Sequence, residues 1–364
     1  MLNPIAEIFA TKAQLMELAW GTRLGLAGLT SLVLVFVLFR PFYSMMTRKQ
    51  VREGGRDASE VGKLAELHAA KRNTVTMGGL LMLAAIVPTT LLWAEWNIYT
   101  LCALGVMLAF GVLGFIDDFL KISMRNKRGL DGKFKLLGQL VISVIALWVL
   151  LEDRQSANHI RELWIPMTEV AFMPVMPVWM TLGLLFLVLV ATSNTVNLTD
   201  GADGLAIGCS ISTLLAFAVV AYLAGSPTLA DGFNLNAIPD AAELSILCVG
   251  MVGAGFAFLW FNGHPAKVFM GDTGSLSLGG TIGIVAFMLN QPFILLVIGG
   301  IFVIEGLSVI LQVASFQLTG RRLFHISPIH HHFEVAGWPE TQVVTRFWIL
   351  SVVFALVGVW LVTL

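Results

Sequence analysis

The chain has 364 residues, a mean hydropathy of +0.83, 12% charged residues and a formal net charge of -1. Too few polar side chains are present to cover a soluble protein of this size, so the composition is typical of a polytopic membrane protein. The net charge indicates no particular partner, and we expect no nucleic-acid ligand.

Ten apolar stretches are close to the length that a helix needs to cross a membrane. We therefore expect an all-α polytopic membrane protein with about ten transmembrane helices, organised as a single integral membrane domain over residues 1–364. The stretches cover about 24–40, 75–94, 97–116, 136–151, 175–192, 204–224, 244–261, 275–289, 293–316 and 343–363.

Lysine and arginine residues are concentrated in alternate connections between these stretches. Of the 22 basic residues, eight fall in the first connection and six in the third, whereas the connections on the other side hold two. Because cytoplasmic loops retain positive charge during insertion, the odd-numbered connections are predicted to be cytoplasmic. The informative polar clusters of the sequence lie in or beside these connections.

The first polar cluster is the pair Asp117 and Asp118 in "GFIDDFLK", at the C-terminal end of a predicted span. A helix dipole presents partial negative charge at that end, which disfavours anions. The two carboxylates could simply mark the boundary with water. We favour a paired site for a cation or for proton transfer, because a purely structural boundary would favour Lys or Arg.

The stretch "TSNTVNLTDGADGLAIG" carries two amides and two carboxylates at intervals of three residues, and its glycines let the backbone approach a ligand closely. Intervals of three place these side chains on one side of a helical turn. An alternative is that the last carboxylate only caps the next span and that the glycines form a turn. The four residues are Asn194, Asn197, Asp200 and Asp203.

In "VFMGDTGSLSLGG", Asp272 precedes small residues at the start of a predicted span. The free amides of a helix N-terminus attract phosphate, and a neighbouring carboxylate can hold Mg²⁺ against it. The competing interpretation is that Asp272 is a plain N-cap. His264 and Lys267, just upstream, could add cationic donors or be ordinary interfacial residues.

The stretch "SPIHHHFE" predicts a short helix with Ser327 as N-cap and Pro328 at its first position. Successive helical residues point about 100° apart, so only one or two of the three imidazoles at 330–332 can face one ligand. A zinc site is disfavoured because neither an HExxH motif nor a cysteine pair accompanies them. Hydrogen-bond donors to a diphosphate fit better.

Together these clusters indicate oxygen-ligated, hard-metal phosphate chemistry at the cytoplasmic membrane surface. A transporter or channel is the alternative class, since intramembrane acids also mark ion pathways. Transport acids should lie at the bilayer midplane, whereas here the acids gather near one face and only Glu305 lies deep. The phosphate interpretation is therefore favoured.

With these motifs the sequence resembles the phospho-N-acetylmuramoyl-pentapeptide transferases, within the polyprenyl-phosphate N-acetylhexosamine-1-phosphate transferase superfamily. The likeness spans nearly the whole chain, and the His triplet favours this branch over the GlcNAc-1-phosphate transferases. Asn73 and Val75 depart from the family pattern, which has Gly and Pro there. The matching motifs are "TMGG" at 76–79, "DD" at 117–118, "GKFKLLGQ" at 132–139, "NTVNLTDGADGLA", "FLWFN", "VFMGDTGSLSLGG", "SVILQV" at 308–313 and "PIHHHFE".

The resemblance implies a magnesium-dependent enzyme of the bacterial inner membrane. Its reaction would transfer phospho-MurNAc-pentapeptide from UDP-MurNAc-pentapeptide to undecaprenyl phosphate, giving lipid I and UMP for peptidoglycan synthesis. The family fold would be ten transmembrane helices around a cytoplasmic-facing cleft, usually assembled as a homodimer.

Carried onto this chain, the resemblance also implies roles for individual residues. Asp272 would be the Mg²⁺ ligand, and Asp117 and Asp118 would bind or activate the lipid phosphate, which makes these three the expected catalytic residues. The expected substrate-binding residues are Asn194, Asn197, Asp200 and Asp203 along the nucleotide and diphosphate, Phe269 near the uracil, His330 and His331 at the sugar-diphosphate, and Lys71 and Lys135 as sources of positive charge.

Overall fold

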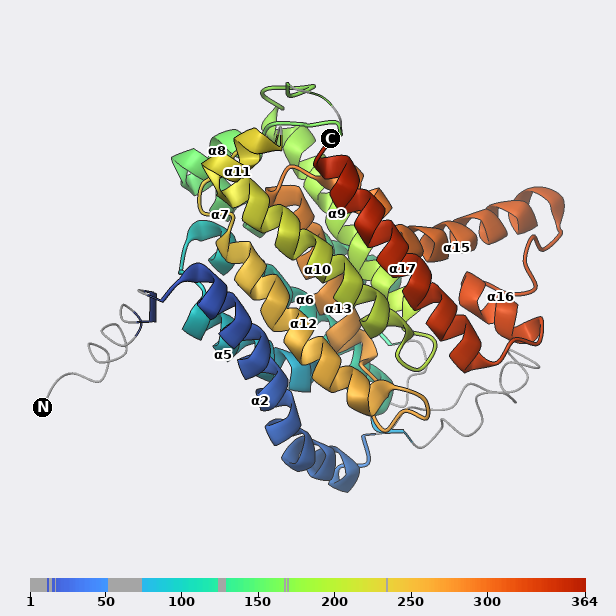
Figure 1. Ribbon diagram of the computed structural model, residues 1–364. Coiled ribbons are helices and arrows are strands. Elements are labelled where there is room, and N and C mark those ends of the chain that lie inside the picture. Colours follow the sequence, from blue (N-terminus) through green and yellow to red (C-terminus); the bar gives the residue numbers. More distant parts are fainter. Residues whose placement is uncertain are drawn as a thin grey trace, which may run out of the picture.

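The computed structural model describes residues 12, 15–16, 18–51, 74–123, 129–166, 168, 170–233 and 235–364. These residues form helices, joined by connections that contain isolated β-bridges (Figure 1). The long helices are α2 (Trp20–Arg48), α5 (Gly79–Trp93), α6 (Ile98–Ser123), α7 (Gly132–Glu152), α9 (Val178–Thr199), α10 (Leu205–Gly225), α12 (Glu243–Asn262), α13 (Gly271–Met288), α15 (Gly300–Thr319) and α17 (Glu340–Val362). The short ones are α8 (Arg154–His159), α11 (Pro227–Gly232), α14 (Pro292–Ile298) and α16 (Ile329–Val335).

The predicted all-α membrane fold is confirmed by the length and composition of the helices. Among the described residues, eight helices are long and apolar enough to cross a membrane, namely α2, α6, α7, α9, α10, α12, α15 and α17. Helix α5 is apolar but has 15 residues. The eighth predicted span, 275–289, corresponds to α13, which starts with the polar sequence "GDTGS" and is not among the eight helices named above.

Helix α13 is the central element of the bundle. It packs along α6 and α9 and also contacts α5 and α10 (Figure 1). Every residue of α13 from Thr273 to Met288 is buried. A helix that is buried on all sides belongs to the interior of a bundle, and in α13 only the first two residues, Gly271 and Asp272, are partly exposed.

Glycines allow α13 to approach its neighbours at backbone distance. A Cβ added at Gly279 would lie 2.5 Å from the carbonyl oxygen of Thr192 and 2.6 Å from Cα of Ser193, both in α9. At the other side, a Cβ on Gly79 of α5 would meet the backbone of Gly274. Small residues are the usual means by which membrane helices pack this closely.

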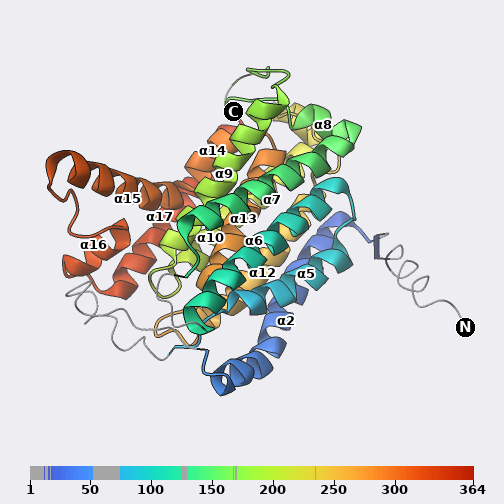
Figure 2. The same ribbon diagram turned by 180° about the vertical axis from the view of Figure 1, so that it is seen from behind.

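The stretch predicted as one span over residues 293–316 is instead two helices. Helix α14 ends at Ile298, and α15 begins at Gly300 after a non-helical Gly299. Two adjacent glycines give this point low helix propensity, and Gly300 packs against the ring of Phe354 in α17. After the break, α15 projects away from the bundle, as both views show (Figures 1 and 2).

A buried ion pair joins helices at the end of the bundle where α2 and α12 begin. Arg23 of α2 donates two hydrogen bonds to the carboxylate of Glu243 in α12, at 2.9 and 2.7 Å. The same carboxylate accepts the backbone N–H of Glu95, which lies between α5 and α6. The bidentate geometry satisfies both charges inside the apolar environment.

We predict that Gly279→Ala lowers the stability of the protein by about 1–3 kcal/mol, because the added methyl group would overlap backbone atoms of α9 that cannot move aside easily. The matched control is Gly105→Ala in α6, where an added Cβ meets nothing within 4 Å. That change should be neutral or stabilising by roughly 0.5–1 kcal/mol, because alanine favours the helix. Thermal unfolding of the purified protein in detergent measures both effects, and equal melting temperatures for the two variants would contradict the prediction.

Candidate active site

Three carboxylates from two helices meet where α6 approaches the start of α13. One oxygen each of Asp117, Asp118 and Asp272 lies within 4.8 Å of the other two. Asp117 and Asp118 are 3% and 5% exposed, although both are charged residues. The prediction that these separated acidic residues come together is therefore confirmed.

Asp118 caps the N-terminus of α13. Its carboxylate accepts the backbone N–H of Asp272 at 3.1 Å, and the backbone N–H and hydroxyl of Thr273 at 3.0 and 2.7 Å. The competing interpretation of Asp272 as the N-cap is wrong, because Met270 occupies that position. The expectation of free amides at this helix end is also wrong for Asp272 and Thr273, whose N–H groups donate to Asp118. The carboxylate and the positive end of the helix dipole stabilise one another.

Two lysines offset the negative charge of this cluster. Lys121, one turn after Asp117 in α6, lies 2.5 Å from an oxygen of Asp117 and 3.1 Å from one of Asp272. Lys135 of α7 reaches the same Asp272 oxygen at 3.0 Å. The backbone N–H of Leu130 also donates to Asp117 at 2.7 Å. Lys135 was predicted for the site as a source of positive charge, whereas Lys121 was not.

The amides of α9 extend the cluster. The Asn197 amide donates to Asp272 at 2.9 Å and to the hydroxyl of Ser275 at 2.8 Å. One turn earlier, Asn194 donates to the side-chain oxygen of Gln139 in α7 at 3.4 Å. The interval of three thus places both amides toward the site side of α9, but only Asn197 contacts an acidic residue of the cluster.

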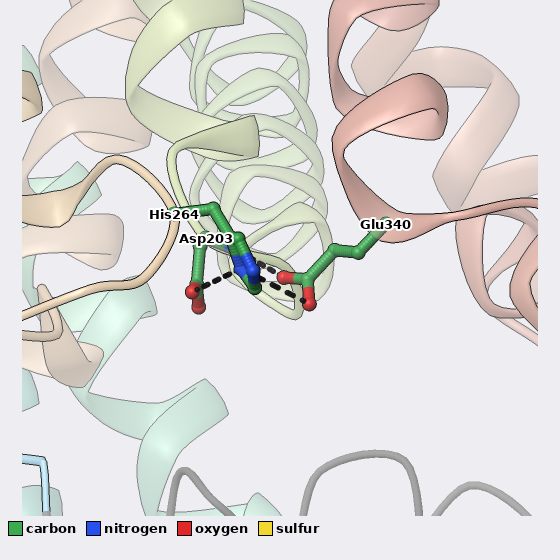
Figure 3. Close-up of side chains that lie close together, drawn as sticks. All are labelled: Asp203, His264 and Glu340. Atoms are coloured by element: carbon green, nitrogen blue, oxygen red, sulfur yellow. Dashed lines mark hydrogen bonds and ion pairs between the residues drawn. The ribbon is translucent and has the colours of Figure 1, made fainter.

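The "DGADG" connection after α9 is held by a second group of charged side chains. The carboxylate of Asp203 accepts the backbone N–H of Ala266 at 3.1 Å and lies 3.0 Å from Nδ1 of His264. Glu340, at the start of α17, accepts the backbone N–H of Asp203 at 2.7 Å (Figure 3). His264 lies between the two carboxylates in Figure 3 and is 3.7 Å from Glu340. Asp203 therefore ties three chain segments together, and it does not cap α10, whose N-cap is Gly204.

The three adjacent histidines do not all face the same way, as their helical spacing predicts. Nδ1 of His330 lies 3.0 Å from Glu305 of α15, and Nδ1 of His331 lies 2.8 Å from Glu334. His332 turns away and stacks on His325, and partial burial together with His325 lowers its pKa.

Both His330 and His331 lie against Gly201 in the "DGADG" connection, where an added Cβ would meet the Nε2 atoms of the two rings. The predicted short helix is also confirmed, although α16 begins one residue later than expected, with Pro328 at the N-cap position.

Comparison with known proteins places the chain in a family. A family model described as glycosyl transferase family 4 matches residues 100–290. A phospho-N-acetylmuramoyl-pentapeptide-transferase of Methylacidiphilum infernorum is 45% identical over 334 residues, covering 91% of this chain and 91% of that protein. Proteins of the same name from Opitutus terrae and Granulibacter bethesdensis are 43% and 44% identical, each over 92% of this chain and 91% of its own length. The chain belongs to the phospho-N-acetylmuramoyl-pentapeptide transferase family.

Two of the family motifs pack against each other through their backbones. Phe269 of "VFMGD" donates its N–H to the carbonyl of Val75 at 2.7 Å and accepts the N–H of Gly78, in "TMGG", at 2.8 Å. Proline, the usual family residue at position 75, could accept the same hydrogen bond, so the departure leaves this pairing intact. Lys71, predicted as a source of positive charge, lies outside the described residues.

The carboxylate-only cluster fits a hard cation such as Mg²⁺, which prefers oxygen ligands. Asp203, His264 and Glu340 also lie close enough together to hold a metal. That group includes an imidazole nitrogen, which suits a hard cation less well than a third carboxylate oxygen. The donor chemistry therefore favours the first cluster, which contains the predicted ligand Asp272.

Several contacting residues were missed by sequence reasoning. Lys121 follows Asp117 by four residues, a helical spacing that could have indicated the ion pair. Gln139 ends a recognised family motif, but its partner is in α9. Glu334 and Glu340 have no local signal, since their partners come together only in the folded protein. The missed residues are Lys121, Gln139, Glu334 and Glu340.

We predict that Asp118→Ala destabilises the protein by about 2–3 kcal/mol, because it leaves two buried amides and a hydroxyl of α13 without their acceptor. Asp118→Asn keeps an acceptor oxygen and should cost less. The matched control is Asp131→Ala, which removes the exposed cap of α7 and should cost about 1 kcal/mol or less. The check is the melting temperature in detergent, and a loss for Asp118→Ala no larger than the control would show that the cap is unimportant.

Proposed function

We propose that this protein transfers phospho-MurNAc-pentapeptide from UDP-MurNAc-pentapeptide to undecaprenyl phosphate, giving lipid I and UMP. The observation that carries the proposal is the cluster of Asp117, Asp118 and Asp272 with two lysines, in a chain that belongs to this transferase family. The reaction takes place at the cytoplasmic face of the bacterial inner membrane. Helix ends rich in basic residues support this orientation, since Arg48 ends α2 and Lys49 follows it, and Lys121 and Lys135 lie on either side of the connection from α6 to α7.

The central difficulty of this reaction is electrostatic, because one anionic phosphate must approach another. Lys121 and Lys135 supply positive charge beside Asp272, and the amide of Asn197 supplies a further donor. Such preorganised groups lower the barrier by opposing the charge that gathers during in-line displacement. The lipid phosphate attacks directly, without a covalent enzyme intermediate. A phosphate monoester has a second pKa of about 6 and is already largely dianionic near neutral pH, so Asp117 need not remove a proton from it.

Asp272, with Asp117 and Asp118 beside it, would hold Mg²⁺ in this proposal. The metal supplies further charge neutralisation on the diphosphate when it is bound. The hydrogen bonds of Asp118 to α13 divide the roles of the two adjacent carboxylates. Asp118 holds the start of α13, and with it Asp272, in position, while Asp117 is the carboxylate of the pair assigned to the lipid phosphate.

The nucleotide and sugar lie on the side of the "DGADG" connection in this proposal. Asp203 is fixed there by His264 and Glu340, while His330 and His331 face Gly201 from α16. The half-buried ring of Phe269 would stack near the uracil. The remaining residues assigned to substrate by family resemblance are Asn194, Asp200 and Lys71. The homodimer stays a prediction from the same resemblance.

The direct test supplies purified protein with undecaprenyl phosphate, Mg²⁺ and either UDP-MurNAc-pentapeptide or UDP-GlcNAc, and measures UMP release. We expect release with the first nucleotide and little with the second. Release with UDP-GlcNAc alone would assign the chain to GlcNAc-1-phosphate transfer instead. No release with either nucleotide would refute the proposal.

We also predict that Asp272→Asn lowers Mg²⁺-supported UMP release by at least about 100-fold, because one of the three carboxylate donors loses its charge. Asp131→Asn, at the exposed cap of α7, is the charge-matched control and should retain activity. Melting temperatures establish that both variants are folded. Near-normal turnover by Asp272→Asn across a magnesium titration would remove Asp272 from the metal site.

A further inference from the structure

A carboxylate and an imidazole form a pair in the interior, on the side of the site formed by α15 and α16. Oε1 of Glu305 lies 3.0 Å from Nδ1 of His330, and both side chains are 0% exposed. In the tautomer with the proton on Nδ1, His330 donates this hydrogen bond to the carboxylate of Glu305. This bond leaves Nε2 as the ring atom available to a ligand and fixes the orientation of the ring.

The free ring atom is directed at the "DGADG" connection. A Cβ added at Gly201 would meet Nε2 and Cε1 of His330, so the ring stands directly over this backbone. Within the described part of the chain, Nε2 of His330 and Oε2 of Glu305 are buried without a hydrogen-bond partner. A buried polar atom without a hydrogen-bond partner costs free energy. A purely structural role for the pair does not explain why Nε2 of His330 lies unpaired against the "DGADG" connection.

We propose that Glu305 is a positioning residue for the transfer reaction, which acts by holding His330 with Nε2 presented to the sugar-diphosphate of the donor nucleotide. The inference rests on the proposed function, since it assumes that His330 contacts that substrate. Glu305 itself touches neither substrate nor metal in this scheme. Its effect passes through the imidazole, as outer carboxylates commonly orient histidines that act on a ligand.

The break between α14 and α15 is what makes this contact possible. Helix α15 starts at Gly300 inside the bundle and then leaves it, so Glu305, five residues after that start, is still buried. Helix α16 returns beneath α15, and its second residue is His330 (Figure 2). Glu305, which the sequence placed deep in a predicted span, thus contacts His330, 25 residues later in the chain.

The test is a double-mutant cycle in the full chain with Glu305→Gln, His330→Gln and the double variant. Each single change should lower kcat for UMP release by roughly 10- to 100-fold, with a smaller change in KM for undecaprenyl phosphate. The double variant should be no slower than His330→Gln alone, because Glu305 acts only through that ring. Glu162→Gln is the matched control, since its carboxylate accepts from Trp164 and Asn236 in a different part of the protein.

Several outcomes would overturn the inference. Wild-type kcat in Glu305→Gln would do so, as would wild-type kcat in His330→Gln, or single effects that multiply in the double variant.

A measurement without substrate separates this inference from the proposed function. Nitrogen NMR of ¹⁵N-histidine-labelled protein should show His330 protonated at Nδ1, and Glu305→Gln should change that signal while Glu162→Gln does not. An unchanged signal would refute the positioning role even if lipid I synthesis were established.

Discussion

The hydrogen bonds between Asp118 and the N-terminus of α13 are the interaction on which the rest of the site depends. They place the only charged residue of α13, Asp272, beside the two acidic residues of α6. Three carboxylates would repel one another strongly in a buried location, but the helix dipole and two lysines compensate them. The position of Asp272 is thus fixed by its own backbone as well as by its side chain.

Close backbone contacts make this arrangement rigid. The carbonyl of Asp272 lies against Gly114 of α6, and Gly274 lies against Gly79 of α5. A larger residue at any of these glycines would push α13 away from the helices that carry its partners. The glycine-rich motifs of the sequence therefore serve packing around the acidic cluster, in addition to any contact with a ligand.

The sequence predicted the type of fold, and it correctly indicated that Asp117, Asp118 and Asp272 lie close together. Those predictions rest on local signals. The length of an apolar stretch, and a charged residue at its end, can be recognised without knowing the fold. The capping role of Asp118 could not be predicted, because its partners Asp272 and Thr273 follow it by 154 and 155 positions in the chain. The same is true of Glu340, whose partner Asp203 lies 137 positions earlier in the chain. That the three imidazoles at 330–332 do not all face the same way was predicted, because it follows from helical geometry alone.

The buried pair of Arg23 and Glu243 has a consequence for how the protein is assembled. The two residues are 220 positions apart, so the arginine of the first long helix is synthesised well before its partner. A buried ion pair that loses one partner is destabilised by about 3–5 kcal/mol, because the other charge is left uncompensated. The start of α2 can therefore pack against the start of α12 in a charge-balanced state only after Glu243 has been synthesised.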